Sequence, residues 1–204
     1  MMKRIALLSL LLVLCVFGER KLYACGHEGP YVGLAYTQLI QHTRDNRYIG
    51  STSTTTAQKI SWGSRYGTQV KFGYDFCGTR FGVEMPIGVN YQLLNNADDV
   101  LVLNLDTNLI IHIIETEGGL DFYWIAGVGA TVVTEGDIDD NSKAGGISGN
   151  FGPGVQYFFN QGKHRSAIGL SIPVKYTMYV GDNLSKDRTS VIGVPVNIGF
   201  TIGF

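Results

Sequence analysis

The chain has 204 residues and a formal net charge of −1 at pH 7. This length suits a single domain, and the near-neutral charge argues against a nucleic-acid partner and against a basic patch that binds membrane surfaces. The 27 glycines are about twice the average usage. They lie among apolar residues and not in a linker, so no domain boundary is predicted.

The amino terminus has the pattern of a secretory signal peptide. Lys3 and Arg4 precede an apolar run, Ile5–Phe17, which is too short to span a bilayer as a helix but suits a signal-peptide core. Ala24 offers a small residue at the cleavage site, so we predict that residues 1–24 are removed and that the rest of the chain is exported. Because no later segment has about eighteen consecutive apolar residues, we expect no transmembrane helix.

After this segment, apolar residues alternate with polar or small residues in eight segments. A period of two indicates β-strands with two unlike faces. The predicted strands cover residues 30–41, 65–76, 80–93, 100–114, 120–133, 147–159, 166–180 and 194–204. In the last strand, for example, Val194 and Phe204 point to one side and Asn197 and Gly199 to the other.

The chemistry of the two faces predicts which one meets lipid. Charged residues and glycines share one face, and the apolar face of each predicted strand carries no charge. A Lys or Arg on the lipid face at mid-depth costs about 2–4 kcal/mol, and open sheet edges are costly in lipid. Eight strands close into a barrel that side chains fill. We therefore predict an all-β fold, an eight-stranded antiparallel up-and-down transmembrane β-barrel over residues 25–204, behind a cleaved signal peptide.

Prolines and aromatic residues mark further features of this barrel. Pro86, Pro173 and Pro195 fall on the lumen face, where each removes a ladder hydrogen bond, and we interpret them as bulges or bends. The aromatic residues gather at the two ends of the strands, as expected of interfacial girdles. One girdle consists of Phe76, Phe81, Phe122, Trp124, Tyr157, Phe159 and Phe204, and the other of Tyr36, Tyr66, Tyr91 and Tyr176.

Two cysteines remain after cleavage, and both fall at the same end of the predicted barrel. Cys25 precedes the first strand, and Cys77 lies in the first tight turn. Export implies an oxidising compartment, so a Cys25–Cys77 disulfide is one hypothesis. An acylated Cys25 is another, because residues 22–25 loosely resemble a lipobox, and a free thiol is the third.

The lumen charges form the most specific constellation in the sequence. Lys71 and Lys175 can face Glu84 and Asp106, where the charges would neutralise one another and satisfy hydrogen bonds. One interpretation is a polar plug, and the other is a gated pore in which the pairs exchange partners. His112 also faces the lumen, either as a hydrogen-bonded filler or as a group that titrates near pH 6.5.

The link after the first strand is the best candidate for binding a partner. Links after the first, fifth and seventh strands are long, as expected of outer loops, and most of the others are short turns. Exposed Arg, Tyr and Trp are favourable interface residues, and the alternative is a solvated loop without a ligand. The candidate residues of the first loop are Arg44, Arg47, Tyr48, Lys59 and Trp62.

Neither an enzyme nor a metal centre is indicated by the spacing of reactive residues. Of His27, His42, His112 and His164, only His42 lies near the predicted outer rim, and no His-x-Ser element is present. Histidine and cysteine lack metal-ligand spacing, and the acidic run 137–141 lacks the spacing of a calcium loop. We expect no catalytic residue, no cofactor and no metal.

The carboxy-terminal strand resembles the one that ends bacterial outer-membrane barrels. Asn197, Gly199, Ile202 and Phe204 match the polar-x-Gly-x-x-apolar-x-apolar signal that the barrel-assembly machinery reads in that family. With residues 31–36, which resemble the opening strand of the opacity-like group, the chain looks like the eight-stranded outer-membrane proteins of the OmpA-transmembrane-domain, OmpX/Ail and opacity types.

This resemblance implies a location and a function class. It implies the outer membrane of a Gram-negative bacterium, with lipid and lipopolysaccharide around the barrel. It also implies a surface antigen or adhesin whose loops meet a host or another extracellular ligand. We therefore predict a non-enzymatic surface protein, and the alternative is a narrow, porin-like channel of low conductance. Ligand and oligomeric state stay open.

Overall fold

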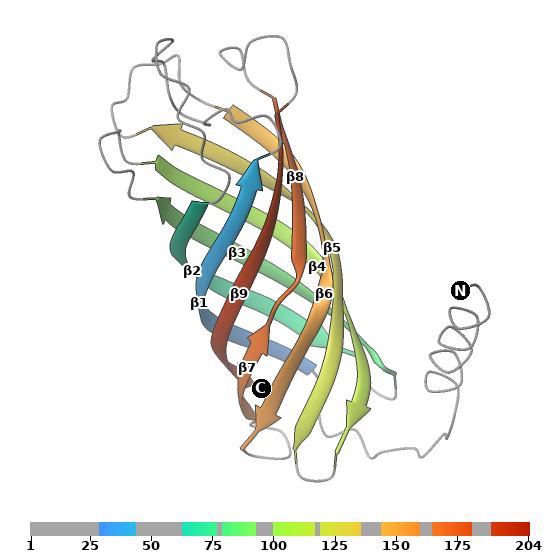
Figure 1. The fold of residues 1–204 in the computed structure, drawn as a ribbon. Coiled ribbons are helices and arrows are strands. Elements are labelled where there is room, and N and C mark those ends of the chain that lie inside the picture. Colours follow the sequence, from blue (N-terminus) through green and yellow to red (C-terminus); the bar gives the residue numbers. More distant parts are fainter. Residues whose placement is uncertain are drawn as a thin grey trace, which may run out of the picture.

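A computed structural model describes the chain over residues 29–43, 63–76, 79–92, 100–116, 119–135, 144–159, 165–180 and 189–204. These ranges form nine β-strands that curl into one barrel (Figure 1). The strands are β1 Gly29–Thr43, β2 Gly63–Asp75, β3 Phe81–Gln92, β4 Val100–Glu115, β5 Leu120–Glu135, β6 Ala144–Phe158, β7 Ser166–Ser171, β8 Val174–Val180 and β9 Thr189–Gly203. No helix among the described residues is long and apolar enough to cross a bilayer.

The sheet is antiparallel throughout and closes on itself. Apart from β7 and β8, strands that follow one another in the chain pair as neighbours, and β1 pairs with β9 from Tyr31–Gly203 to Thr43–Val191. β7 and β8 share one position in the wall between β6 and β9. The barrel is therefore eight-stranded, and its closure leaves no open sheet edge, as a lipid environment requires.

The break between β7 and β8 comes from two prolines on facing strands. Pro173 lies in the break, and the register of the flanking pairs sets it opposite Pro195 of β9. The Ile172 N–H donates to the Pro153 carbonyl of β6 at 3.0 Å. The backbone groups of the next residue, Pro173, therefore point toward β9. Because neither Pro173 nor Pro195 has an N–H group, this rung loses both ladder hydrogen bonds.

The prolines do not form bulges, so that part of the interpretation was wrong. The ladder between β3 and β4 skips Pro86, and the β7/β8 ladder with β9 skips Pro195, yet the register on both sides is unchanged. A proline removes a donor without adding a residue, so it interrupts a ladder without shifting it. The register shifts instead between His112 and Ile114 of β4, where β5 has no partner for Ile113.

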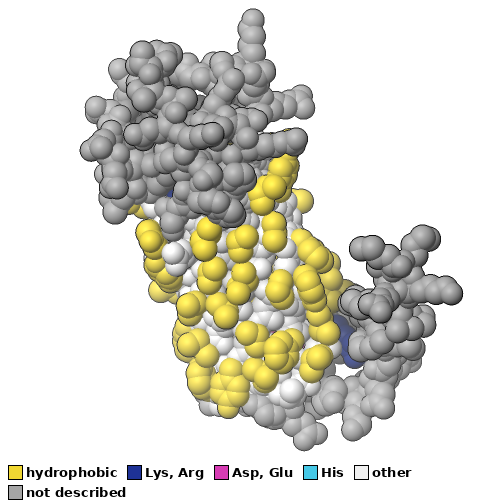
Figure 2. All heavy atoms as spheres, in the orientation of Figure 1, with side chains coloured by type: hydrophobic (Ala, Val, Ile, Leu, Met, Phe, Trp, Pro, Cys, Tyr) yellow, Lys and Arg dark blue, Asp and Glu magenta, His cyan; other side chains and the backbone are white. Residues whose placement is uncertain are grey.

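The outer face of the barrel is apolar. Every strand contributes large exposed hydrophobic side chains, and they cover the described wall in Figure 2. Where burial is described, no Asp, Glu, Lys or Arg side chain is exposed. Exposed aromatic rings lie at both ends of the strands, with Phe204 at one end and Tyr36 toward the other. This surface suits contact with lipid and not with water.

The inner face is polar and closely packed, and glycines make room for its large side chains. Tyr31 of β1 lies over Gly73 of β2, its partner in the ladder, and Tyr123 of β5 lies over Gly154 of β6 in the same way. A Cβ atom at either glycine would overlap the tyrosine ring. The glycines of the lumen face thus have a packing role.

Candidate functional site: the charged lumen

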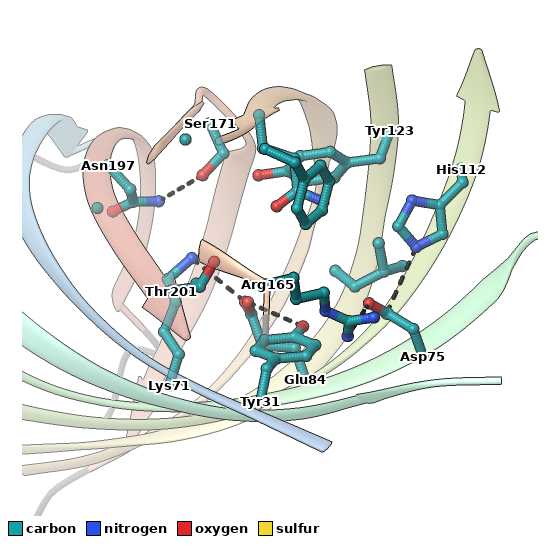
Figure 3. A pocket seen from close by; sticks show the side chains of 15 residues that line it. Tyr31, Lys71, Asp75, Glu84, His112, Tyr123, Arg165, Ser171, Asn197 and Thr201 are labelled. Atoms are coloured by element: carbon teal, nitrogen blue, oxygen red, sulfur yellow. Dashed lines mark hydrogen bonds and ion pairs between the residues drawn. The ribbon is translucent and has the colours of Figure 1, made fainter. Parts of the chain in front are cut away.

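Two small cavities lie inside the barrel and share part of their lining. Their volumes are about 30 Å³ and about 50 Å³. Four residues line both cavities and therefore lie at their shared boundary, which we call the septum: Lys71, Glu84, Ser171 and Asn197. Figure 3 shows the first cavity with these residues around it.

The septum is held by one ion pair and a chain of neutral hydrogen bonds. Lys71 Nζ lies 3.4 Å from Glu84 Oε1, and both side chains are about nine-tenths buried. Asn197 donates to Ser171 Oγ at 3.1 Å and accepts from Thr37 Oγ1 at 2.9 Å. The septum thereby connects β2, β3, β7, β9 and β1 across the lumen.

A second ion pair crosses the larger cavity. Lys175 of β8 donates to both carboxylate oxygens of Asp106 on β4, at 2.8 and 2.7 Å, and it lies 3.3 Å from Asn104 Oδ1. Ser148 donates to Asp106 at 3.2 Å. Both charges are thus buried with partners, which is the condition for tolerating them in a low dielectric.

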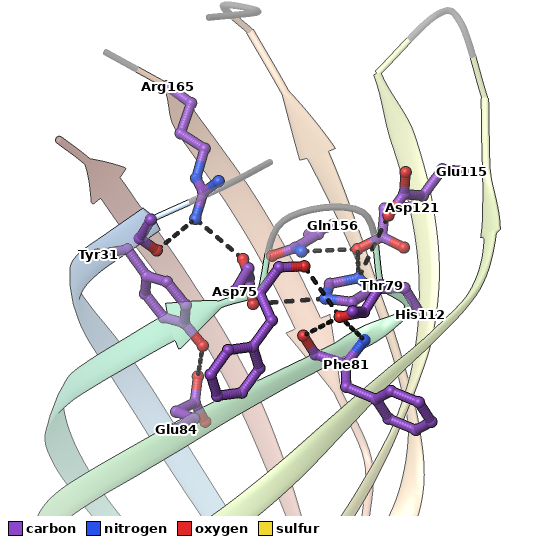
Figure 4. Close-up of polar contacts among 12 residues, drawn as sticks. Tyr31, Asp75, Thr79, Phe81, Glu84, His112, Glu115, Asp121, Gln156 and Arg165 are labelled. Carbon is purple, nitrogen blue, oxygen red and sulfur yellow. Dashed lines mark hydrogen bonds and ion pairs between the residues drawn. The ribbon is translucent and has the colours of Figure 1, made fainter. Parts of the chain in front are cut away.

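A larger network fills the opposite half of the lumen (Figure 4). Asp75 accepts from Arg165 at 2.9 Å and lies 3.4 Å from His112 Nε2. The other ring nitrogen of His112, Nδ1, lies 2.9 Å from Asp121 Oδ2, which also accepts from Gln156 at 2.7 Å. Asp75, His112 and Asp121 therefore form a continuous chain of buried polar groups from β2 through β4 to β5.

Tyr31 links this network to the septum. Its hydroxyl donates to Glu84 Oε2 at 3.3 Å, so Glu84 binds Tyr31 with one oxygen and faces Lys71 with the other. The Arg165 guanidinium lies 5.8 Å from the centre of the Tyr31 ring, close enough for a cation–π contact. Arg165 also donates to the Gly29 carbonyl at 3.2 Å.

The structure pairs the lumen charges named by the sequence and adds others. Lys71 meets Glu84, and Lys175 meets Asp106. His112 is buried in the lumen, but its partners are Asp75 and Asp121 and not the four named charges. Cys25, Cys77 and the loop residues Arg44, Arg47, Tyr48, Lys59 and Trp62 lie outside the described residues.

Sequence reasoning missed Asp121, Tyr31 and Arg165. Asp121 and Tyr31 occupy lumen-facing positions of the predicted alternation, so their positions in the alternation would have been enough to identify them. Arg165 immediately precedes the predicted seventh strand, where no alternation had begun, and only closure of the barrel brings it to Asp75.

The residues of the carboxy-terminal signal divide between the two faces. Asn197 is buried in the septum, and Gly199 packs against Ala35 of β1. Ile202 and Phe204 are exposed on the outer face. The role of this pattern in assembly stays a prediction.

Comparison with known proteins rests on structure, because no family model and no curated protein matches this sequence. Among solved structures, the chain is similar to Neisserial surface protein A (NspA), with a TM-score of 0.63 and 12% sequence identity over 86% of this chain and 97% of that one. The chain has the fold of an eight-stranded outer-membrane β-barrel.

Weaker similarities extend to two further outer-membrane barrels. OprG from Pseudomonas aeruginosa matches with a TM-score of 0.46 and 16% identity, over 88% of this chain and 98% of that one. Ail of Yersinia pestis, solved in complex with the heparin analogue sucrose octasulfate, matches with a TM-score of 0.45 and 16% identity, over 85% and 99%. At such identities the likeness concerns the fold alone.

Proposed function

We propose that this protein is a non-enzymatic surface protein of the Gram-negative outer membrane, whose barrel anchors loops that contact another surface. The observation that carries the proposal is the filled lumen. The septum residues line both cavities, whose volumes are only about 30 and 50 Å³, and a cavity needs roughly 10–15 Å³ of such volume to hold one water molecule. Each of these two cavities therefore has room for only a few water molecules, which supports an anchor and not a solute channel.

The topology gathers the long links at one end of the barrel. Residues 44–62, 136–143 and 181–188 connect β1 to β2, β5 to β6 and β8 to β9. In the antiparallel barrel, the strand ends that these three links join lie at one end, as do the ends of β3 and β4 that residues 93–99 join. The carboxy terminus and the shorter turns lie at the opposite end. We assign the long links to the cell surface and the other end to the periplasm.

The first link carries the binding function in this proposal. Arg44, Arg47 and Lys59 outnumber the single acidic residue of the link, Asp45, and Tyr48 and Trp62 add aromatic contact area. Arg, Tyr and Trp dominate the energetics of many interfaces. A link with this composition favours an anionic partner, such as a sulfated polysaccharide on a host surface or in the matrix.

Two features of the mature chain belong to the same proposal. Residues 1–24 act as the export signal, and the barrel domain begins at Cys25. Cys25 then lies at the periplasmic end, where it forms a disulfide with Cys77, carries an acyl group or stays free. Mass spectrometry of the mature amino terminus distinguishes these three states.

The binding proposal is tested on cells that display the full chain. The first variant replaces residues 44–62 with a Gly/Ser segment of equal length, and the second is R44Q/R47Q/K59Q. Adhesion to heparin-coated beads should fall to background in both variants. The lumen variant K175A, compared with wild type at equal surface abundance, should bind like wild type. Wild-type cells that do not adhere, or loop variants that adhere equally well, would overturn the assignment of a polyanion to this link.

A narrow channel is the second function to be tested, because charged residues line both cavities. Conduction would require the Lys71–Glu84 pair to separate and open the septum. Planar-bilayer recordings on folded protein should show no discrete openings. Reproducible openings that change in K175A would replace the anchor proposal with the channel.

A further inference from the structure

The β-bulge in β4 changes which residues face the lumen. Up to His112, the even-numbered residues of β4 point inward, and continued alternation would turn position 115 toward lipid. Ile113 has no partner on β5, and Ile114, which is exposed, pairs with Phe122. As a result Glu115 points inward beside His112. Bulges often redirect a side chain at functional sites.

The redirected glutamate completes a cluster of three potential metal ligands. Glu115 pairs in register with Asp121 of β5. His112 Nδ1 lies 2.9 Å from Asp121 Oδ2 and 3.9 Å from Glu115 Oε1, and one ligand atom from each residue lies within 4.8 Å of the others. Two donors on one tetrahedral Zn²⁺ lie roughly 3.4 Å apart for bonds of about 2.1 Å. The two distances from Nδ1 bracket this value.

The surroundings of the cluster are those of a supported metal site. His112 faces the cluster with Nδ1 and points Nε2 at Asp75 Oδ1, 3.4 Å away. Metal-binding histidines commonly donate their second ring N–H to a carboxylate in this way. Arg165 holds Asp75, and Gln156 donates to Asp121. Each ligand that is fully buried is thus oriented by a neighbour.

One buried atom of the cluster lacks a partner. Asp121 is fully buried, with 0% of its surface exposed, yet its Oδ1 atom accepts no hydrogen bond. A buried carboxylate oxygen without a partner is unfavourable and calls for an explanation such as an ion. Its other oxygen, Oδ2, already faces His112 and Gln156, so a cation bound by both oxygens of the carboxylate would also satisfy Oδ1.

We propose that His112, Glu115 and Asp121 bind one divalent transition-metal ion, with Zn²⁺ the best match, at the periplasmic end of the lumen. One imidazole nitrogen and two carboxylates form a donor set suited to such ions. The ion takes the place of the proton between His112 and Asp121. Glu115, whose side chain is 29% exposed, lies on the open side of the cluster and marks the route of entry. This site is independent of the loops and of the proposed adhesion.

Zinc binding by the purified protein tests the proposal. The untagged protein carries C25S/C77S so that no thiol competes, and it is stripped with a chelator in detergent. Titration against a fluorescent zinc indicator should give one ion per barrel. E115Q should weaken binding about tenfold or more, H112A should abolish it, and D75N should weaken it by about 10–100-fold as an outer-shell change.

Two further measurements keep the test decisive. E84Q removes another buried lumen carboxylate outside the cluster and should leave zinc affinity unchanged. Heat-shift gels show which variants are folded. If H112A does not fold, E115Q still tests the site, because it changes only a half-buried side chain. Zinc-edge X-ray absorption should show an imidazole and oxygen ligands. Folded wild type without saturable binding, or E115Q that binds like wild type, would overturn the site.

Discussion

Removing Lys175 should destabilise the barrel, because it leaves a buried carboxylate without its cation. In K175M, Asp106 loses donors at 2.8 and 2.7 Å and keeps the Ser148 hydroxyl at 3.2 Å. Breaking a buried ion pair by removing one partner costs about 3–5 kcal/mol. Because 12% of the Asp106 side chain is exposed, we expect a loss of about 3 kcal/mol in the free energy of unfolding.

The double variant separates the value of the pair from the cost of an orphaned charge. K175M/D106L replaces both charges by apolar side chains, and such replacements are often neutral or stabilising by about 1–4 kcal/mol. We expect it to recover most of the stability lost in K175M. K71M should cost less, about 1.5–3 kcal/mol, because the Tyr31 hydroxyl still donates to Glu84 and the Lys71–Glu84 distance is longer, at 3.4 Å.

The assay is guanidinium unfolding of the barrel in detergent or vesicles, followed by tryptophan fluorescence and analysed by linear extrapolation. A loss below about 1 kcal/mol in K175M would match a solvent-exposed ion pair. Water would then solvate Asp106 without Lys175, and the lumen would be open to solvent. That result would refute the filled lumen and with it the main support for an anchor without a channel.

Three further outcomes follow from the packing of the wall. G154V places a side chain on the Tyr123 ring and should cost about 1–3 kcal/mol by overpacking in the same unfolding assay; an unchanged midpoint would show that the ring moves freely. Deleting Ile113 removes the bulge but keeps Glu115 on the lumen side, so the heat-shifted band should persist. Zinc affinity should fall, because the deletion changes the spacing of Glu115 from His112. Loss of the folded band would contradict this account of the bulge. P173A supplies a donor toward β9 and should give a slowly exchanging amide at that position, measured by hydrogen exchange, whereas a fast-exchanging amide would mean that the rung stays open.

The barrel could be predicted from the sequence because lipid and lumen select opposite chemistry. In β9, Ile198 and Phe200 are exposed on the outer face and Asn197 is buried inside, as the alternation predicts. Recognising a period of two needs no knowledge of distant contacts, since the chemistry of each side chain indicates which face of the strand it lies on. Strand ends agree with the structure within three residues, except that β9 begins at Thr189, five residues before the predicted start. The division of the seventh strand at Pro173 was also not predicted, although it comes from a chemical property that the sequence shows.

The bulge at Ile113 could not be predicted in this way. Both Ile113 and Ile114 are apolar, so either suits the lipid face and the alternation gives no sign of an extra residue. The one local sign is Glu115, which would carry a charge into lipid if the alternation continued. Near a strand end, a charged residue at a position that the alternation would turn toward lipid is therefore the sign that predicts a bulge.

Partners across the lumen depend on how the sheet curls. Lys71 and Glu84 lie on neighbouring strands, where the register sets Lys71 opposite Pro86 and leaves Glu84 two residues along on the same face, within reach of the lysine. Lys175 and Asp106 come from β8 and β4, which do not pair. Hairpin register is a local property, whereas contacts through the lumen require strand number and tilt together. The sequence therefore named the charges but not their partners.

The lumen charges also have a role that requires no transport. A slip of one residue in a strand would turn every side chain to the other face, and Lys71 would then meet lipid at a cost of about 2–4 kcal/mol at mid-depth. The buried charges thus disfavour wrong registers, even though apolar replacements of the same pairs could match them in stability. On this argument K175M/D106L unfolds like wild type but assembles into the barrel with lower yield, because its strands no longer distinguish inside from outside as sharply. Equal yields of wild type and K175M/D106L in parallel refolding reactions would refute this role in assembly and would favour a functional role for the charges in the lumen.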